Sequence, residues 1–428
     1  MHPDRVRARV DRSNATVEEL RAETASWLGA RRADPRFARF ADHLGILERV
    51  FGEMLAALGG ELDLAREIRG SRETYERCAR LDRGVLVVRR LFDWYAAKYD
   101  QRRDPRFGTV LAAADEVVRS CWREPFARVG AVPPSGPLVY LEPRFDAYAT
   151  PRVSVPVDLR APADAVVAAF VHELPIPVVC LPGWATREAW WLTLAAHETG
   201  HHVQHDLGDL RYATQEALAA VGPEWVSWSG ELFADAYSVL MVGPSALWAV
   251  AELQHGQEDR SPRPGDAYPP PSVRLALMSE IARQSGLGDP GHPTELPQGP
   301  GIPQMPEISR AASAVLALKV QDHSLPEISG LRQEWFQPGG LAAIWAERLT
   351  EHDPLLTRLD ERSAARVLVS AGVIAAETHP AAKARDRVHE NLSATLPRCG
   401  PPGTMAGDTP SSQVDAIARR LAAQLVAP

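Results

Sequence analysis

Apolar side chains recur at three- and four-residue intervals through the first part of the chain, as Phe37, Phe40, Leu44 and Leu47 illustrate. Residues with this spacing share one face of a helix, so the pattern predicts amphipathic helices that pack against one another. Residues 1–130 are therefore expected to form a helical region.

The pattern changes near residue 131, where short apolar stretches between polar and proline residues replace the helical spacing. Strands are expected over 138–141, 153–157 and 166–171. The stretch 175–182 is also apolar, but its prolines favour the edge of a sheet, because proline has no backbone N–H for the strand ladder. These segments predict a small sheet.

Helical spacing returns after the sheet. A long helix is expected to begin near Thr186, a suitable N-cap, and to reach about residue 207, and a second is expected over 230–241. Glycine and proline dominate 286–306, which predicts a linker or a loop that can cover a cleft as a lid. A flexible tail is expected at 397–412. Further helices are expected over 311–320, 341–349, 364–376 and 414–426. The expected fold class is α+β and mostly helical.

Composition and charge narrow the class of protein. The chain has 428 residues, 45% hydrophobic residues, a formal net charge of −8 and a sequence pI near 5.9. This acidity argues against nucleic acid as the main partner, because phosphate binding needs a basic face. Arginine greatly outnumbers lysine, which we interpret as coding bias rather than as a recognition surface, because alanine is abundant as well.

The sequence also predicts a cytoplasmic protein. It has no apolar run of about 18 residues that could span a bilayer, and its first residues lack the apolar segment of a signal peptide. The four cysteines show no C-x-x-C spacing, which fits a reducing compartment. Export by a route without a signal peptide stays open.

One segment indicates a specific chemistry. His197-Glu198-Thr199-Gly200-His201 matches the pattern H-E-x-x-H. Residues four apart share a helix face, so His197 and His201 can direct both imidazoles at one metal ion. Glu198 lies beside them and can take the proton of a zinc-bound water. Gly200 weakens the helix, which suggests that a neighbouring element crosses closely there.

A zinc site needs a third protein ligand. The longer pattern H-E-x-x-H-x-x-G-x-x-H is excluded, because Gln204 and Leu207 stand at its Gly and His positions. The alternative is a glutamate from a following helix, and the candidates are Glu216, Glu224 and Glu231. Glu231 is preferred because Asp235 follows four residues later, where it can accept a hydrogen bond from a ligand imidazole.

Other residues are candidates for supporting roles. A hydrogen-bond donor beside the metal usually stabilises the charge that develops on the substrate. The candidate donors are Tyr212, Tyr237, Tyr268 and Arg274. Arg274 can instead have a structural role, bonded to Asp235 or to a backbone carbonyl. The strand expected near 176–181 either aligns an extended peptide by backbone pairing or is simply part of the sheet core.

The segment from His197 to Gln204, followed by Glu231-Leu232-Phe233-Ala234-Asp235, resembles the gluzincin metallopeptidases. Within that group it is most similar to the bacterial neutral zinc metallopeptidases, with their H-E-x-G-H-H-x-Q and E-L-x-A-D patterns. The proline-then-arginine segment 268–274 is also similar to one in related peptidases. The resemblance covers roughly residues 185–280, and Ala236 departs from the cysteine that the family often has.

The resemblance implies one Zn²⁺ per chain, held by His197, His201 and Glu231, with Glu198 as general base. It also implies a zincin-like core with a small sheet over 131–285. The regions 1–130 and 307–428 then flank this core, with 286–306 as the connection to the second of them.

Three functions are consistent with these observations. The first is a zinc metallopeptidase that acts on a peptide or protein substrate. The second is a catalytically silent scaffold whose helical flanks bind a protein partner, and the third is a zinc hydrolase of a non-peptide amide.

Overall fold

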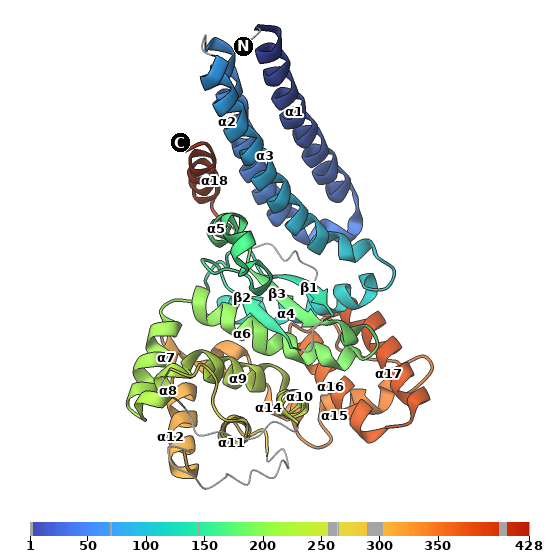
Figure 1. Cartoon of the computed structure of the whole chain (residues 1–428). Helices are drawn as coiled ribbons and strands as arrows, with labels where there is room; N and C mark the ends of the chain where they lie inside the picture. The colour runs from blue at the N-terminus through green and yellow to red at the C-terminus, as the bar shows by residue number, and fades with distance from the viewer. Residues whose placement is uncertain are drawn as a thin grey trace.

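Long helices at the start of the chain form an arm that projects from the rest of the molecule (Figure 1). They are α1 (Pro3–Ala33), α2 (Ala41–Glu67) and α3 (Ser71–Asp100), which pack against one another. The helix α18 (Ser411–Val426), from the far end of the sequence, lies against α2 and completes the arm. The computed structural model describes residues 3–68, 71–143, 146–255, 263, 265–288, 303–401 and 409–427.

A small sheet lies at the base of this arm. Within the described residues its strand order is β1-β3-β2, with β1 (Leu138–Glu142) parallel to β3 (Val178–Pro182) and β2 (Tyr148–Thr150) antiparallel to β3. All residues of β3 are buried. The α+β class, mostly helical with a small sheet, is confirmed.

Three strand predictions in this region are wrong, and the first two concern 175–182 and 166–171. The stretch 175–182 forms the central strand, not an edge, because Pro175 and Pro177 precede the paired residues and only Pro182, at the end, lies within the strand. The stretch 166–171 belongs to the helix α5 (Ala165–Glu173). Its apolar residues occupy a helical face that packs against α3, and this packing overrides the β-propensity of its valines.

The stretch 153–157 is not a strand either. It leads into the 3₁₀ turn η3 (Val157–Leu159), and the nearby strand is β2 instead. Val153 has a positive φ of 59°, which is outside the extended region.

The long helix begins later than expected. Thr186 closes the 3₁₀ turn η5 (Gly183–Thr186), because its hydroxyl donates to the carbonyl of Gly183 over 2.7 Å instead of capping a helix. A second 3₁₀ turn, η6 (Ala189–Thr193), follows, and α6 then runs over Leu194–Asp206. The helix expected at 230–241 is confirmed as α9 (Ser229–Val242).

The helix α4 (Gly108–Arg128) connects the parts of the molecule. It packs against α6, β1 and α16 (Ala364–Thr378), and the Tyr237 hydroxyl of α9 donates to its Cys121 carbonyl over 2.6 Å. The boundary expected at residue 130 therefore comes two residues after α4, and α4 packs against elements that follow this boundary in the sequence. The division into domains stays a prediction.

The remaining elements surround α6 and α9 or extend the body of the molecule (Figure 1). The helices are α7 (Leu210–Ala219), α8 (Pro223–Ser227), α10 (Ser245–Gln254), α11 (Pro271–Gln284), α12 (Met305–Leu316), α13 (Leu325–Ser329), α14 (Gln333–Phe336), α15 (Leu341–Leu349) and α17 (Ala382–Thr395). The shorter elements are η1 (Pro35–Phe40), η2 (Gln101–Arg103), η4 (Pro162–Asp164), η7 (Leu396–Arg398) and a hairpin of β4 (Lys319–Val320) and β5 (His323–Ser324).

The helices expected in the last third of the chain correspond to α12, α15, α16 and α18. The first of them ends at Leu316 rather than 320, because Lys319 and Val320 pair in the hairpin. Most of the expected loop 286–306, and residues 402–408 of the expected tail, lie outside the described residues. In the part that is described, no helix is both long and apolar enough to cross a membrane.

A buried histidine joins the arm to the segment before the sheet. Nε2 of His43 lies 3.0 Å from the carbonyl oxygen of Gly136, which can only accept, so Nε2 is the donor. In the neutral ring Nδ1 is then an acceptor, and the Tyr99 hydroxyl donates to it over 2.9 Å. Burial is the main cause that lowers the pKa of His43 from 6.5 to about 3. The folded protein therefore keeps this imidazole neutral.

We expect acid to destabilise the protein partly through His43. Below pH 6.5 the unfolded chain binds a proton that the folded chain does not, so stability is lost as the pH falls toward 3. At pH 5 this loss is about 2 kcal/mol. Urea unfolding at pH 7.5 and 5 should show a pH dependence smaller by about that amount in His43→Gln, which cannot titrate. An equal pH dependence in both proteins would contradict the assignment.

Candidate metal centre

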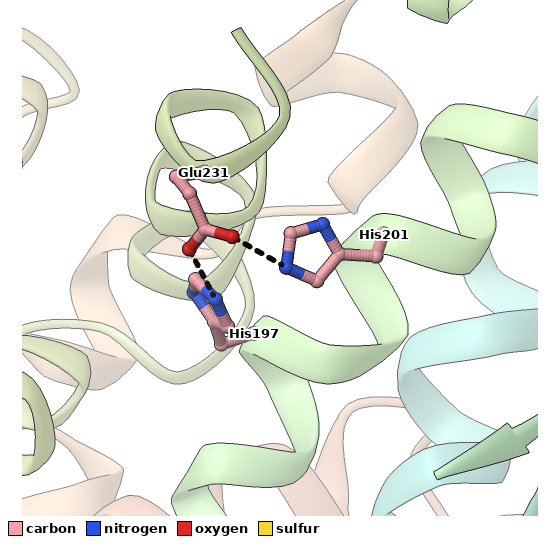
Figure 2. A group of neighbouring side chains, drawn as sticks. All are labelled: His197, His201 and Glu231. Atoms are coloured by element: carbon pink, nitrogen blue, oxygen red, sulfur yellow. Dashed lines mark ion pairs between the residues drawn. The ribbon is translucent and has the colours of Figure 1, made fainter. Parts of the chain in front are cut away.

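One face of α6 carries a pair of imidazoles. His197 and His201 lie one helical turn apart, and Figure 2 shows both rings on the same side of α6, facing the carboxylate of Glu231. The next residue, His202, points elsewhere, with Nε2 3.2 Å from the carbonyl of Val178 in β3. His201 thus faces the candidate metal centre, while His202, the next residue, contacts the sheet.

Glu231, on the first turn of α9, supplies a carboxylate between the two rings. Its Oε2 lies 3.4 Å from Nε2 of His197, and its Oε1 lies 3.6 Å from Nε2 of His201. In the described part of the chain, these are the residues whose ligand atoms gather in one place, all within 4.8 Å of one another. Glu216 and Glu224, the other candidates, are exposed on α7 and α8.

A close approach of two helices brings Glu231 to the histidines. A Cβ added at Gly200 would lie 3.0 Å from the Cα of Ala234 and 3.2 Å from the ring of Tyr237. The expectation that a neighbouring element crosses closely at Gly200 is therefore confirmed, and that element is α9. Gln204 adds a polar tie, because its side-chain amide donates to the carbonyl of Ser229 over 3.3 Å.

The donor set fits a zinc ion. Zinc in proteins takes imidazole nitrogen and carboxylate oxygen at bond lengths that place neighbouring ligands of a tetrahedral site about 3.3–3.5 Å apart. The separations of 3.4 and 3.6 Å between Glu231 and the two imidazoles agree with this geometry. Three protein ligands would leave a coordination position for water or substrate.

Asp235 and Arg274 support His197 from behind. Oδ1 of Asp235 lies 2.9 Å from Nδ1 of His197, which leaves Nε2 to face Glu231. Arg274, on α11, donates to both oxygens of Asp235, from Nε over 2.6 Å and from Nη2 over 2.8 Å. This pairing matches the structural role considered for Arg274. The same guanidinium lies 3.6 Å from Glu231.

The charges around His197 favour a cation at this centre. Burial would lower the pKa of His197, but hydrogen bonds with Asp235 and Glu231 outweigh burial and raise it to about 10. His201 has less compensation, so burial lowers its pKa to about 4. The carboxylates therefore create a position that stabilises positive charge, which is the charge a metal ion would bring.

Glu198 is buried beside the two histidines. Burial is the main cause that raises its pKa to about 7, and the charge of Glu231 contributes, while a backbone hydrogen bond from Ala149 acts in the opposite direction. Within the described chain it does not belong to the group of candidate ligands. Its role as a general base stays a prediction.

These residues line an open cleft of about 670 Å³. The β2 residues Tyr148 and Ala149 form one wall, and Tyr268 forms part of another. Because β3 is paired on both sides, the proposed peptide-aligning strand at 176–181 cannot accept another strand. The strand at the edge of the sheet that lines the cleft is β2.

The three tyrosines considered as hydrogen-bond donors differ in whether they line the cleft. Tyr268 lines the cleft with 63% of its surface exposed, and the charge of Glu231 is the main cause that raises its pKa to about 12. Tyr237 does not line the cleft, and its hydroxyl donates to the carbonyl of Cys121 in α4. Tyr212 is 70% exposed and does not line the cleft.

Several cleft residues had no signal in the sequence. Tyr148 and Ala149 belong to a strand of only three residues, too short to show an alternating pattern. Arg160 and Arg211 also line the cleft, from a loop and from α7, and no motif surrounds either of them. These residues come close to α6, which carries the H-E-x-x-H motif, only in the folded protein.

We expect the purified protein to bind about one zinc ion per chain at this centre. Glu231→Ala should abolish stoichiometric binding, and Asp235→Asn should weaken it about 10–100-fold, because the acceptor of the imidazole N–H loses its negative charge. Elemental analysis and competition with a chromogenic chelator measure both effects. His205→Ala, at the end of the same helix, is the control, and equal zinc loss in this control would contradict the assignment.

We expect Gly200→Ala to destabilise the protein by about 1–3 kcal/mol, because the added methyl must push α6 and α9 apart. Gly45→Ala, in α2, is the matched control, since a Cβ there meets no atom within 4 Å. Because alanine has a higher helix propensity than glycine, Gly45→Ala should leave the free energy of unfolding unchanged or raise it by up to about 1 kcal/mol. Urea unfolding compares the two variants, and equal effects would argue against close packing at Gly200.

The chain was compared with protein-family models, with curated proteins and with solved structures, and none of these comparisons found a match. The resemblance to the gluzincin metallopeptidases therefore rests on short sequence motifs and on the arrangement of their side chains.

Proposed function

We propose that this protein is a zinc-dependent peptidase of gluzincin type. The observation that carries the proposal is the gathering of His197, His201 and Glu231 at an open cleft, with Glu198 buried beside them. A purely structural metal site needs no additional carboxylate at that position. Glu198 therefore favours a catalytic centre over a silent scaffold.

The residues of the chain have distinct roles in this proposal. A zinc ion held by the three ligands would supply Lewis acidity toward a water molecule and a substrate carbonyl. The carboxylate of Glu198 takes a proton from the water and returns it to the leaving amine. Asp235 holds the imidazole of His197 in one tautomer, and Arg274 holds Asp235.

Tyr268 is the best-placed donor for the charge that develops on the substrate carbonyl. Its phenol lines the cleft and stays protonated at neutral pH, so it can donate a hydrogen bond. The guanidinium of Arg274 is held by both oxygens of Asp235, which makes it less suitable for this task.

The shape of the cleft favours a peptide over a small amide. The strand β2 lies at the edge of the sheet, and its middle residue, Ala149, directs its N–H away from β3 toward Glu198. An extended peptide can lie along such an edge and bring a backbone carbonyl to the metal centre. A cleft of about 670 Å³ has room for several residues of that peptide.

We expect Glu198→Gln to keep its zinc and to lose peptidase activity by about 10²–10⁴-fold, because the amide cannot take the proton. Cleavage of a diverse peptide library, followed by mass spectrometry, measures activity beside zinc content. Glu216→Gln, which changes an exposed glutamate on α7, is the matched control and should retain full activity.

Each other outcome has a definite meaning. Full activity in Glu198→Gln would overturn the mechanism. If the zinc-loaded wild type cleaves small acyl amides but no peptide, the substrate is a non-peptide amide. If it cleaves neither, the scaffold function is favoured, and a partner of the helical regions is then the object to identify.

A further inference from the structure

A second, smaller cavity of about 250 Å³ lies beside α4. It shares no lining residue with the metal cleft in the described structure. One face of α4 supplies most of its wall, and the rest comes from one residue before α16 and one residue after η7. The lining residues are Arg119, Ser120, Arg123, Glu124, Ala127, Arg362 and Pro401. We call it the arginine cavity.

The arginine cavity is strongly basic in an otherwise acidic protein. Three arginines and a single glutamate are the charged groups among its described lining residues. Glu124 is already engaged, because Nε of Arg128 donates to it over 2.7 Å and Arg366 lies 3.7 Å away. Arg119 is paired with Glu116, a carboxylate that also accepts from Arg39 over 2.8 Å.

Several positive charges lie close together around the arginine cavity. Burial lowers the pKa of Arg123, and the next causes are the positive charges of Arg119 and Arg362, while the negative charge of Glu116 acts in the opposite direction. Folding therefore brings these guanidinium groups together against their mutual repulsion. A partly enclosed cavity of one sign of charge concentrates counter-ions, because its low-dielectric walls focus the field.

The residue type indicates which counter-ion fits. Guanidinium presents a rigid fork of N–H donors that matches the oxygens of phosphate. A phosphate group carries about −1.5 to −2 charges at neutral pH, so it neutralises more of this excess than a monovalent anion. The cavity lies below the usual ligand-pocket volume of about 300–1,000 Å³, so the ligand is small.

We propose that the arginine cavity binds a phosphate group, either as inorganic phosphate or as part of a small phosphate monoester. Arg123 and Arg362 approach the ligand from opposite segments of the chain. Arg119 is held in place by Glu116 and completes the basic wall. A bound phosphate would then join α4 to the segment that precedes α16.

Calorimetric titration of the full-length, zinc-loaded protein at pH 8 tests this proposal. The probes are inorganic phosphate and phenyl phosphate, with sodium chloride at matched ionic strength as the reference. We expect saturable binding in the millimolar range or tighter, and a rise in Tm of about 2 °C or more near saturation. Binding of phosphate alone indicates the free ion, and tighter binding of phenyl phosphate indicates a monoester.

The variants locate the binding. Arg123→Gln and Arg362→Gln should each weaken binding at least about tenfold, because each removes a charge-assisted hydrogen-bond donor. Arg123→Lys keeps the charge and the aliphatic stem if the glutamine variant does not fold, and it should lose part of the affinity. Arg419→Gln, on the exposed face of α18, is the matched control and should bind as wild type.

A further variant separates this cavity from the metal centre. Glu231→Ala should bind phosphate as wild type, because its substitution lies at the other cavity. The proposal is overturned if phosphate does not saturate by 10 mM, if chloride gives the same rise in Tm, or if Arg123→Gln and Arg362→Gln bind normally. It is equally overturned if Glu231→Ala abolishes binding.

Discussion

The close contact between α6 and α9 at Gly200 is the constraint on which the candidate centre depends. The histidines stand on one helix and Glu231 on the other, so the distance between helices sets the size of the space among their ligand atoms. A side chain at 200 would meet the backbone of Ala234. The glycine that weakens the helix locally is thus what permits the separations of 3.4 and 3.6 Å between ligand atoms.

The charges of the centre follow from the same contact. Three carboxylates, those of Glu198, Glu231 and Asp235, are brought out of water around two imidazoles, and Arg274 is the guanidinium that meets them. Burying several acidic groups together is costly unless positive charge compensates. The bidentate pairing of Arg274 with Asp235 supplies part of that compensation, and it attaches α11 to the back of the centre.

The central part of the site could be predicted from sequence because its residues repeat at helical intervals. His197 and His201, like Glu231 and Asp235, are four apart, and this spacing alone places each pair on one face. The contribution of β2 could not be predicted, since three residues carry no periodic signal. The central position of β3 was also hidden, because prolines beside a strand resemble prolines within it. The arginine cavity combines α4 with residues near 362 and 401, which only the tertiary fold brings together.

The attachment of α18 to α2 has a consequence for how the protein acquires its fold. The two helices are separated by more than 340 residues of sequence, yet Arg49 and Asp415 approach to 2.7 Å across their contact. During synthesis, the apolar strip of α2 that α18 covers stays open until the rest of the described chain has emerged from the ribosome. Contacts between segments so distant in sequence form slowly, and apolar surface stays exposed until they form. The arm of α1, α2, α3 and α18 can therefore be completed only after α18 has been synthesised.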